Sequence, residues 1–345
     1  MAPEPLRPHS LFAGDPASRL DPLQPALIEA PTLTSADEDS AQPKGLRQLG
    51  PRLDSDCWFL CGPTAAGKTS LAIDLAGRLE AEIISVDSMA VYKGLDIGTA
   101  KPSLLERSRV PHHLIDIVNP SESYSVAHWL TAADQAVELI RSRGKRILFV
   151  GGTPLYLRAL RNGLALLPAA NPEFRRQLVA EVASMGVDEP FCSHSLHAKL
   201  VTIDPPAAAR IHPNDMRRII RALEVAHATG RPLSESFAPA PHPVFQTQMM
   251  IVDLSRRLLI SRIERRVKEM FSRGLVAEVE AASALPGGIG FTARQATGYA
   301  QTLDLLAGRL TLNEAIAQTQ QATRQLAKRQ LTWLRSFKDA IWITA

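Results

Sequence analysis

One short motif limits what this chain can fold into. An apolar run at 58–61 leads into a segment of the form G-x-x-x-x-G-K-[ST], and an amphipathic stretch follows it. The segment comprises Gly62, Pro63, Thr64, Ala65, Ala66, Gly67, Lys68 and Thr69. Its glycines let backbone N–H groups turn inward around a phosphate, and the helix that follows directs the positive end of its dipole there. Lys68 adds a full charge, and the Thr69 hydroxyl can hold Mg²⁺. We therefore predict a diphosphate or triphosphate site; an ordinary glycine-rich turn is the alternative.

The segments around this motif alternate between strand and helix patterns. Short apolar runs at 57–61, 82–86 and 146–150 are typical of buried strands, and helical periodicity covers 68–79 and 125–143. Such alternation implies parallel strands joined by right-handed crossovers. The predicted fold class is therefore α/β: a P-loop NTPase-like parallel sheet flanked by helices, with a helical insertion domain.

Changes in composition divide the chain into four parts. Residues 1–53 are rich in proline with little apolar periodicity, and we predict a disordered N-terminal extension there. The first part of the core follows at 54–167. A helical insertion is expected at 168–245, with helices near 172–186, 206–211 and 214–229. The core resumes at 246–345, where we expect strands near 247–253 and 340–342 and helices at 257–283, 293–307, 311–318 and 319–336.

Polar turns follow two further predicted strands, at the edge where ligands of parallel sheets gather. Asp87 and Ser88 come after the second strand, and Thr153 follows two glycines after the third. Asp87 could cap a turn, hold Mg²⁺ through water, or act as a general base. Thr153 could cap the next helix, or hydrogen-bond to a substrate or to Asp87. The three turns should converge on one site.

Composition excludes several protein classes. The 345 residues are 45% hydrophobic and 21% charged, as in soluble globular proteins, and no apolar run approaches the length of a membrane span. Three cysteines form neither an even disulfide framework nor a metal-spaced cluster, so we expect a reducing cytoplasm. His112 and His113 point apart and lack a third ligand at metal spacing, which favours a loop role or a substrate contact.

Basic residues indicate a polyanionic partner. Beyond residue 53 the chain holds 34 Lys and Arg against 28 Asp and Glu, a net charge of +6. Basic residues also recur at helical spacing, and although a solvated face explains any one group, several groups beside a phosphate loop favour a polyanion. The groups are Arg217 with Arg218 and Arg221, Arg262 with Arg266, and Arg324 with Lys328 and Arg335.

Taken together, several segments resemble the tRNA dimethylallyltransferase (isopentenyl-tRNA transferase) family of the bacterial type. They occur in family order and span residues 56–337, which leaves the N-terminal extension outside. The segments are the phosphate loop, SVDS at 85–88, YKGLDIGTAKP at 92–102, VGGTPLY at 150–156, RIHPND at 210–215, GY at 298–299 and TRQLAKRQ at 323–330.

The resemblance implies a reaction. The family moves a dimethylallyl group from dimethylallyl diphosphate to the N6 amine of the adenosine 3′-adjacent to the anticodon, position 37, in tRNAs reading codons that start with U. Residues 62–69 would bind the diphosphate with Mg²⁺ on Thr69, and Lys68 and Arg266 would stabilise the departing pyrophosphate. Asp87 would take the amine proton and Thr153 would hold the amine, once the adenine has left its stack.

The resemblance also implies that the protein binds an anticodon stem-loop, in part through the helical insertion. It implies a monomeric enzyme that does not contact a membrane. The expected tRNA-binding residues are Asp87, Ser88, Met89, Ala90, Thr153, Arg175, Arg217, Arg218, Ile219, Ile220, Arg221, Gln295, Ala296, Thr297, Gly298, Tyr299 and Ala300. Three of them depart from the family pattern. Many relatives carry a longer residue at Ala90, an aliphatic one at Thr297 and a basic one at Ala300, so a phosphate contact from position 300 should be missing.

Other functions fit part of the pattern. A small-molecule kinase would use the same loop with ATP but has no role for the basic groups. A prenyltransferase acting on free adenine nucleotides would have little use for a basic helical insertion. A nucleotide-dependent switch or RNA-binding module without chemistry would need no base at Asp87.

Overall fold

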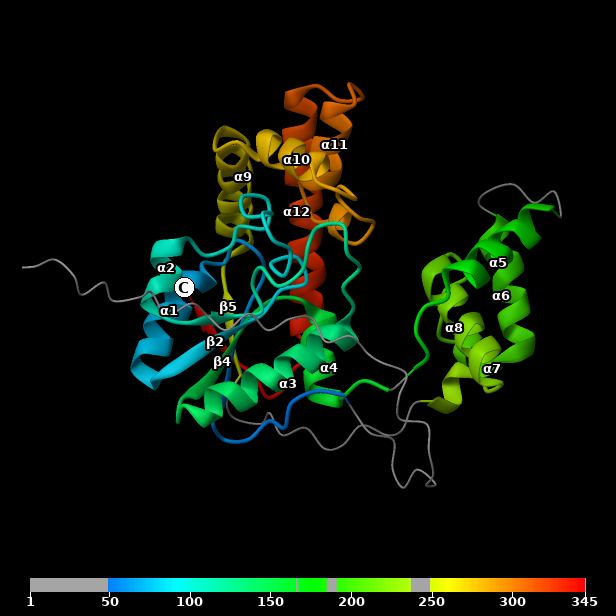
Figure 1. The fold of residues 1–345 in the computed structure, drawn as a ribbon, viewed down its shortest axis with the longest axis horizontal. Helices are drawn as coiled ribbons and strands as arrows, with labels where there is room; N and C mark the ends of the chain where they lie inside the picture. The colour runs from blue at the N-terminus through cyan, green and yellow to red at the C-terminus, as the bar shows by residue number, and fades with distance from the viewer. Residues whose placement is uncertain (1–48, 166, 185–190, 237–248, 345) are drawn as a thin grey trace, which may run out of the picture.

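The fold is a single parallel sheet between two layers of helices (Figure 1). The computed structural model describes residues 49–165, 167–184, 191–236 and 249–344. All the paired strands run parallel, in the order β3-β2-β4-β1-β5-β6. The strands are β1 Cys57–Cys61, β2 Ala81–Val86, β3 His112–His113, β4 Arg146–Gly151, β5 Met249–Asp253 and β6 Ile341–Thr344. The predicted parallel α/β fold is confirmed.

Alternate residues of the central strands pack into different apolar clusters, because successive side chains of a strand point to opposite faces. Phe59 and Phe149 stack, with ring centroids 4.8 Å apart, on the face covered by α3 Val126–Ser142 and α4 Pro154–Asn162. The same apolar cluster continues into α10 Leu275–Ala284 and α11 Tyr299–Leu306. Leu60 and Leu148 pack on the other face, against α1 Lys68–Leu79, α9 Arg256–Ser272 and α12 Leu312–Leu334. Burial on both faces explains why the strands read as continuous apolar runs.

The segment predicted as an insertion contains helices joined by short loops, and no strand, in its described part. It contains α5 Pro172–Ser184, α6 Phe191–Ile203, α7 Pro205–Ala208, α8 Met216–Thr229 and the short 3₁₀ helix η1 Leu233–Ser236. These helices share a core of their own, which includes Leu178, Leu200 and Leu223. Figure 1 shows them to one side of the sheet. Helix α6 was not predicted, because its apolar residues are spread around the helix rather than gathered on one face.

Several predicted boundaries shift in the structure. The single helix expected at 257–283 is two, α9 and α10, separated at Gly274, whose φ of 101° is a left-handed conformation that favours glycine. Conversely, the helices expected at 311–318 and 319–336 form one helix, α12, because no residue between them interrupts helical geometry. The segment expected at 293–307 comprises the 3₁₀ turn η2 Ala293–Gln295 and α11. Helix α2, Leu104–Arg109, was also not predicted.

The chain enters the core earlier than expected. Most of the extension predicted over 1–53 lies outside the described residues. Leu49, however, forms an antiparallel bridge with Leu164, and Leu49 and Leu53 pack against the main core. Residues 49–53 therefore belong to the packed structure. Among the described helices, none is both long and apolar enough to cross a membrane.

Candidate active site

A cavity of about 170 Å³ lies at the carboxyl ends of the central strands. It is lined by the phosphate loop from Thr64 to Thr69, by Asp87 after β2 and by Gly151 and Gly152 after β4. Arg266 of α9 also lines it. The predicted convergence of these turns is confirmed, because the parallel order β2-β4-β1 brings their carboxyl ends to one edge.

The phosphate loop has the backbone that its glycine pattern predicts. Gly67, which precedes the first residue of α1, has a φ of 89°, a conformation that a side chain would strain. Ala65 also has a positive φ, of 63°. Lys68 folds back over the loop, where its Nζ donates to the carbonyl oxygens of Gly62 at 3.0 Å and Pro63 at 2.7 Å. The loop thus has the left-handed turn and the inward-folded lysine expected of a phosphate loop.

The pKa of Lys68 is lowered to about 8, mainly by burial and to a lesser extent by the nearby positive charge of Arg266. The carboxylate of Asp87 partly offsets both effects. Burial likewise lowers the pKa of Arg266, and Asp87 again acts in the opposite direction. Two desolvated cations therefore face the cavity with one carboxylate, and a bound anion would stabilise both of their charged forms.

The carboxylate of Asp87 is only partly engaged. Its Oδ1 accepts hydrogen bonds from the backbone N–H of Met89 at 2.8 Å and of Ala90 at 3.3 Å, so the turn-capping interpretation is confirmed for that oxygen. Its Oδ2 makes no hydrogen bond to any residue that the structure describes. One oxygen therefore fixes the turn, and the other remains open for a proton or a metal ion.

Thr153 connects two of the turns. It occupies the position before the first residue of α4, but its side chain makes no capping bond, so the helix-capping interpretation is wrong. Its Oγ1 instead accepts from the backbone N–H of Ser88 at 3.2 Å. Because this bond uses the hydroxyl as an acceptor, the hydroxyl can still donate to a ligand.

Close backbone packing explains the glycines after β4. A Cβ on Gly152 would lie 2.5 Å from the carbonyl oxygen of Gly62, and one on Gly151 would lie 2.1 Å from that of Val86. Gln330 of α12 bridges the same two turns, since its Oε1 accepts from Thr64 N at 2.8 Å and its Nε2 donates to Gly152 O at 2.9 Å. No role was predicted for Gln330, although it is the last residue of the family-like segment at 323–330.

Comparison with known proteins identifies the family of this chain. The profile of the IPP transferase family matches residues 90–337, and that of isopentenyl transferases matches residues 55–111. The chain belongs to the IPP transferase family.

Named relatives match most of the chain. A tRNA dimethylallyltransferase of Geobacter metallireducens is 44% identical over 287 residues, which are 82% of this chain and 90% of the relative. One of Halorhodospira halophila is 46% identical over 296 residues, 83% of this chain and 92% of the relative.

Solved structures of similar proteins have the same fold. The tRNA isopentenylpyrophosphate transferase of Bacillus halodurans is 42% identical, with a TM-score of 0.59 over 84% of this chain and 89% of the other. A eukaryotic dimethylallyltransferase, described as acting on tRNA, is 29% identical, with a TM-score of 0.66 over 84% of this chain and 74% of the other.

The loop at 96–98, which leads into the cavity-lining residues 99–102, is anchored by one carboxylate. Glu278 of α10 accepts hydrogen bonds from the backbone N–H of Asp96 at 2.8 Å, Ile97 at 2.7 Å and Gly98 at 3.2 Å. It also accepts from the hydroxyl of Tyr299 at 2.6 Å. Glu278 was not predicted, although an acid within the largely apolar stretch of α10 was a possible signal.

Several predicted tRNA-binding residues have buried side chains. Tyr299 is fully buried beneath the anchored loop, and Ala296 is buried beside it. Ile219 lies in the core of the insertion, with Ile220 packed against that core. Gly298, with a φ of 100°, precedes the first residue of α11, next to the partly exposed Thr297 and Ala300. Any contact from the fully buried side chains would have to come through the backbone.

The predicted arginines of the insertion divide into two kinds. Arg175 and Arg221 both hold the buried carboxylate of Glu224, with bonds of 2.8 Å and 2.5 Å to its Oε2. Burial would raise the pKa of Glu224, but hydrogen bonds from these two arginines outweigh it and lower the pKa to about 2. Arg218 is exposed and pairs with Asp215. The first two arginines therefore support the fold of the insertion.

Arg217 links the insertion to the core. Its Nη1 donates to Oε1 of Gln295 at 3.2 Å, and its guanidinium lies 5.6 Å from the ring centroid of Phe291. Phe291 itself is 72% exposed. Two segments predicted to bind tRNA, on α8 and around η2, therefore meet in space although 78 residues separate them in the chain.

The two adjacent histidines form a strand at the edge of the sheet. They form β3, where His113 Nε2 lies 2.6 Å from Oε2 of the buried Glu82. The ring of His112 hydrogen-bonds to the carbonyl of Val110 and borders the cavity. The described residues contain no group of three or more His, Cys, Asp and Glu side chains placed to hold a metal ion.

Proposed function

We propose that this chain transfers a dimethylallyl group from dimethylallyl diphosphate to the N6 amine of adenosine 37 in tRNAs that read codons beginning with U. One observation carries the proposal: a phosphate loop, two desolvated cations and a half-engaged carboxylate face a single cavity. Family membership and relatives named tRNA dimethylallyltransferase support the same reaction.

The phosphate loop would bind the donor. Backbone N–H groups of residues 64–69 would surround the diphosphate at the start of α1, where the helix dipole favours negative charge. Lys68 and Arg266 would neutralise the charge that grows on the diphosphate as its bond to the allylic carbon breaks. Because both cations are desolvated, their interaction with that charge is stronger than it would be in water.

Asp87 and Thr153 would prepare the acceptor. The flipped adenine would present its N6 amine to the allylic carbon, and the Thr153 hydroxyl would orient it. As the N6–carbon bond forms and the carbon–oxygen bond of the donor breaks, Oδ2 of Asp87 would take the amine proton. The products are the N6-dimethylallyl adenosine, pyrophosphate and a protonated Asp87 that later releases its proton to solvent, so atoms and charge balance.

The donor set of the cavity suits Mg²⁺. Thr69 contributes a hydroxyl and Asp87 a carboxylate, and Mg²⁺ commonly binds one or two such oxygens together with substrate phosphates. Thr69 would hold the ion, with Asp87 within reach through water. When bound, Mg²⁺ would supply positive charge to the diphosphate.

The anticodon stem-loop of tRNA would bind where the insertion meets the core. Arg217 and Gln295, which contact each other there, and the exposed Arg218 would lie at this surface. We also propose that the enzyme works as a monomer, because one chain supplies the phosphate loop, both cations and the carboxylate of the cavity. The cytoplasm is the compartment that we propose for it, as the cysteine pattern of the sequence predicts.

The deciding experiment supplies the protein with labelled dimethylallyl diphosphate, Mg²⁺ and an anticodon stem-loop carrying adenosine 37, with ATP in a parallel reaction. We expect label on the RNA and no phosphate transfer from ATP. A stem-loop with guanosine at position 37 is the matched control. Turnover of ATP without use of the allylic donor would contradict the proposal and indicate a kinase.

A further inference from the structure

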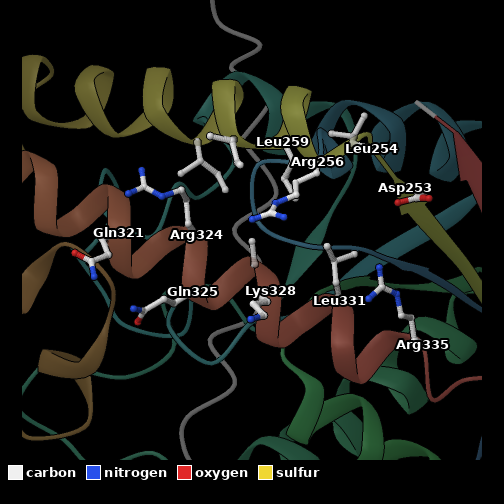
Figure 2. Close-up of a pocket in the computed structure, with 13 residues that line it drawn as sticks. Asp253, Leu254, Arg256, Leu259, Gln321, Arg324, Gln325, Lys328, Leu331 and Arg335 are labelled. Carbon is white, nitrogen blue, oxygen red and sulfur yellow. The ribbon is translucent and has the colours of Figure 1, made fainter.

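A groove lies between α9 and α12, beyond the end of β5 (Figure 2). Its volume is about 690 Å³, roughly four times that of the active-site cavity. Concave sites of roughly 300–1,000 Å³ with a largely apolar lining and a few converging polar groups are typical of small-molecule binding. We call it the α9–α12 groove.

The groove carries unpaired positive charge. Arg256, Arg324, Lys328 and Arg335 all line it, and Figure 2 shows the last three along α12 with Arg256 extending toward α12 from the start of α9. Arg324 pairs with Glu264, its Nη1 lying 3.2 Å from Oε1. The other three cations form no ion pair with any residue in the described ranges, and Asp253 is the one acid among the described lining residues. Such a surface selects for an anion, and a multivalent one can engage several cations together.

The apolar part of the lining is aliphatic. It consists of Leu254, Leu259, Ile260, Ile263, Ala327 and Leu331. The described lining includes no aromatic side chain, so a nucleotide base would find no ring on which to stack. An aliphatic chain would instead bury its surface there, at about 0.8 kcal/mol for each buried methylene group. The lining therefore favours a ligand with an anionic head and an aliphatic chain.

The groove is separate from the active-site cavity. The two share no described lining residue, although the same helices serve both: Arg266 and Gln330 face the cavity, while Ile263 and Leu331 face the groove. An anion in the groove would therefore meet a different set of cations from the diphosphate at the phosphate loop.

We propose that the α9–α12 groove is a second ligand site, which binds a prenyl diphosphate longer than the five-carbon dimethylallyl group. The prenyl chain of the ligand packs on the leucines and isoleucines, and its diphosphate lies between Arg256, Lys328 and Arg335. The proposal rests on the groove residues alone and does not require the transfer reaction.

Calorimetry with geranyl diphosphate tests the site in a Lys68→Ala background, which disables the phosphate loop. We expect binding to persist in Lys68→Ala and to weaken at least about tenfold when Arg256→Ala and Arg335→Ala are added, since both remove charge-assisted contacts. The matched control adds Arg257→Ala and Lys338→Ala, two exposed cations outside the groove, and should bind as the background does. Loss of all binding in Lys68→Ala, or equal affinity of the groove and control variants, would overturn the proposal.

Three further probes distinguish the contribution of the ligand's aliphatic chain from that of its anionic head group. Inorganic pyrophosphate, ATP and decanoate should each bind at least about tenfold more weakly than geranyl diphosphate, because each lacks either the aliphatic chain or the multivalent head. Equal affinity for pyrophosphate or ATP would mean a plain anion site, and equal affinity for decanoate a fatty-acid site; either result refutes the proposed ligand.

Photolabelling of the wild-type protein tests the site without any variant that could fail to fold. A photoreactive geranyl diphosphate should label the peptide at 254–263, which contributes to the groove and not to the active-site cavity, and unlabelled geranyl diphosphate should compete. Labelling confined to the phosphate loop and the turn at Asp87 would refute the second site.

Discussion

The side-chain amide of Gln330 hydrogen-bonds to both Thr64 and Gly152, at 2.8 Å and 2.9 Å. The phosphate loop after β1 and the turn after β4 are thereby held together by a residue near the C-terminal end of α12. A Cβ on Gly152 would lie 2.8 Å from Nε2 of the same amide, so the turn and the amide fit without spare room.

Gln330→Ala should weaken the site more than the fold. Two backbone groups lose their partner, which should lower the free energy of unfolding by about 1–3 kcal/mol. Displacement of the loop should slow transfer by up to about 10²-fold, since misplacement of reacting groups by about 1 Å can cost that much. Denaturant titration and single-turnover kinetics measure the two effects. Gln318→Ala, at an exposed position of α12, is the control, and equal turnover in both variants would contradict this role.

Asp87→Asn separates the two roles of the Asp87 side chain. The amide oxygen can still accept from Met89 N and Ala90 N, so the turn should survive, but the side chain can no longer take a proton. Transfer should fall by about 10²-fold or more, the scale of general-base removal, while calorimetry shows unchanged affinity for dimethylallyl diphosphate. Normal turnover would remove Asp87 from proton transfer.

The lowered pKa of Lys68 predicts how diphosphate binding depends on pH. The free protein loses the ammonium charge as pH rises through about 8, whereas a bound diphosphate stabilises that charge. Affinity for pyrophosphate should therefore be highest below about pH 8 and fall above it. Calorimetry on both sides of that pKa tests this, and Lys68→Arg, which stays charged, should lack the decline. The same fall in both proteins would assign it to another group.

The lowered pKa of Lys68 also predicts how the free energy of unfolding changes with pH. Because the folded pKa of Lys68 lies below its ordinary value of 10.5, the unfolded chain binds more protons between about pH 8 and pH 10.5. The contribution of Lys68 to the free energy of unfolding should therefore rise with pH across that window. Denaturant titrations of wild type and Lys68→Met at the two ends of the window measure this. The free energy of unfolding of Lys68→Met should exceed that of wild type by less at the higher pH. A difference between the two proteins that does not change with pH would contradict the assignment.

Glu278→Ala should release the loop at 96–98. Three backbone N–H groups and the hydroxyl of Tyr299 lose their common acceptor, so amide exchange of Asp96, Ile97 and Gly98 should accelerate. Hydrogen-exchange mass spectrometry detects this, with Glu280→Ala, an exposed neighbour on α10, as the control. Unchanged protection in Glu278→Ala would show that other contacts hold the loop.

The phosphate loop, Asp87 and the three central strands could be predicted because their signals are local. A glycine at a left-handed position, an apolar run between turns and an acid at a strand end are each encoded in a handful of neighbouring residues. The parallel order of the strands then follows from the alternation with helices. Where local signals were weak, as in the two-residue strand β3 and the helix α6, the prediction failed.

Contacts that join distant segments could not be predicted. Nothing near Gln330 in the sequence indicates that it meets Thr64, 266 residues away, or that Glu278 holds Ile97, 181 residues earlier. The bonds of Arg175 and Arg221 to Glu224 were likewise not predicted, because the sequence indicates only their positive charge and not the buried partner that packing gives them. Thr153 likewise has the sequence of a helix cap but bonds to Ser88 instead.

From its residue order alone, the chain specifies a glycine-rich turn of the phosphate-loop pattern, a parallel sheet and the edge where its polar residues collect, since backbone conformation responds to near neighbours. The complete packed fold was required to choose the partner of each polar side chain. A buried donor or acceptor must find a matching group, and which group lies within about 3 Å depends on how helices from opposite ends of the chain pack on the sheet.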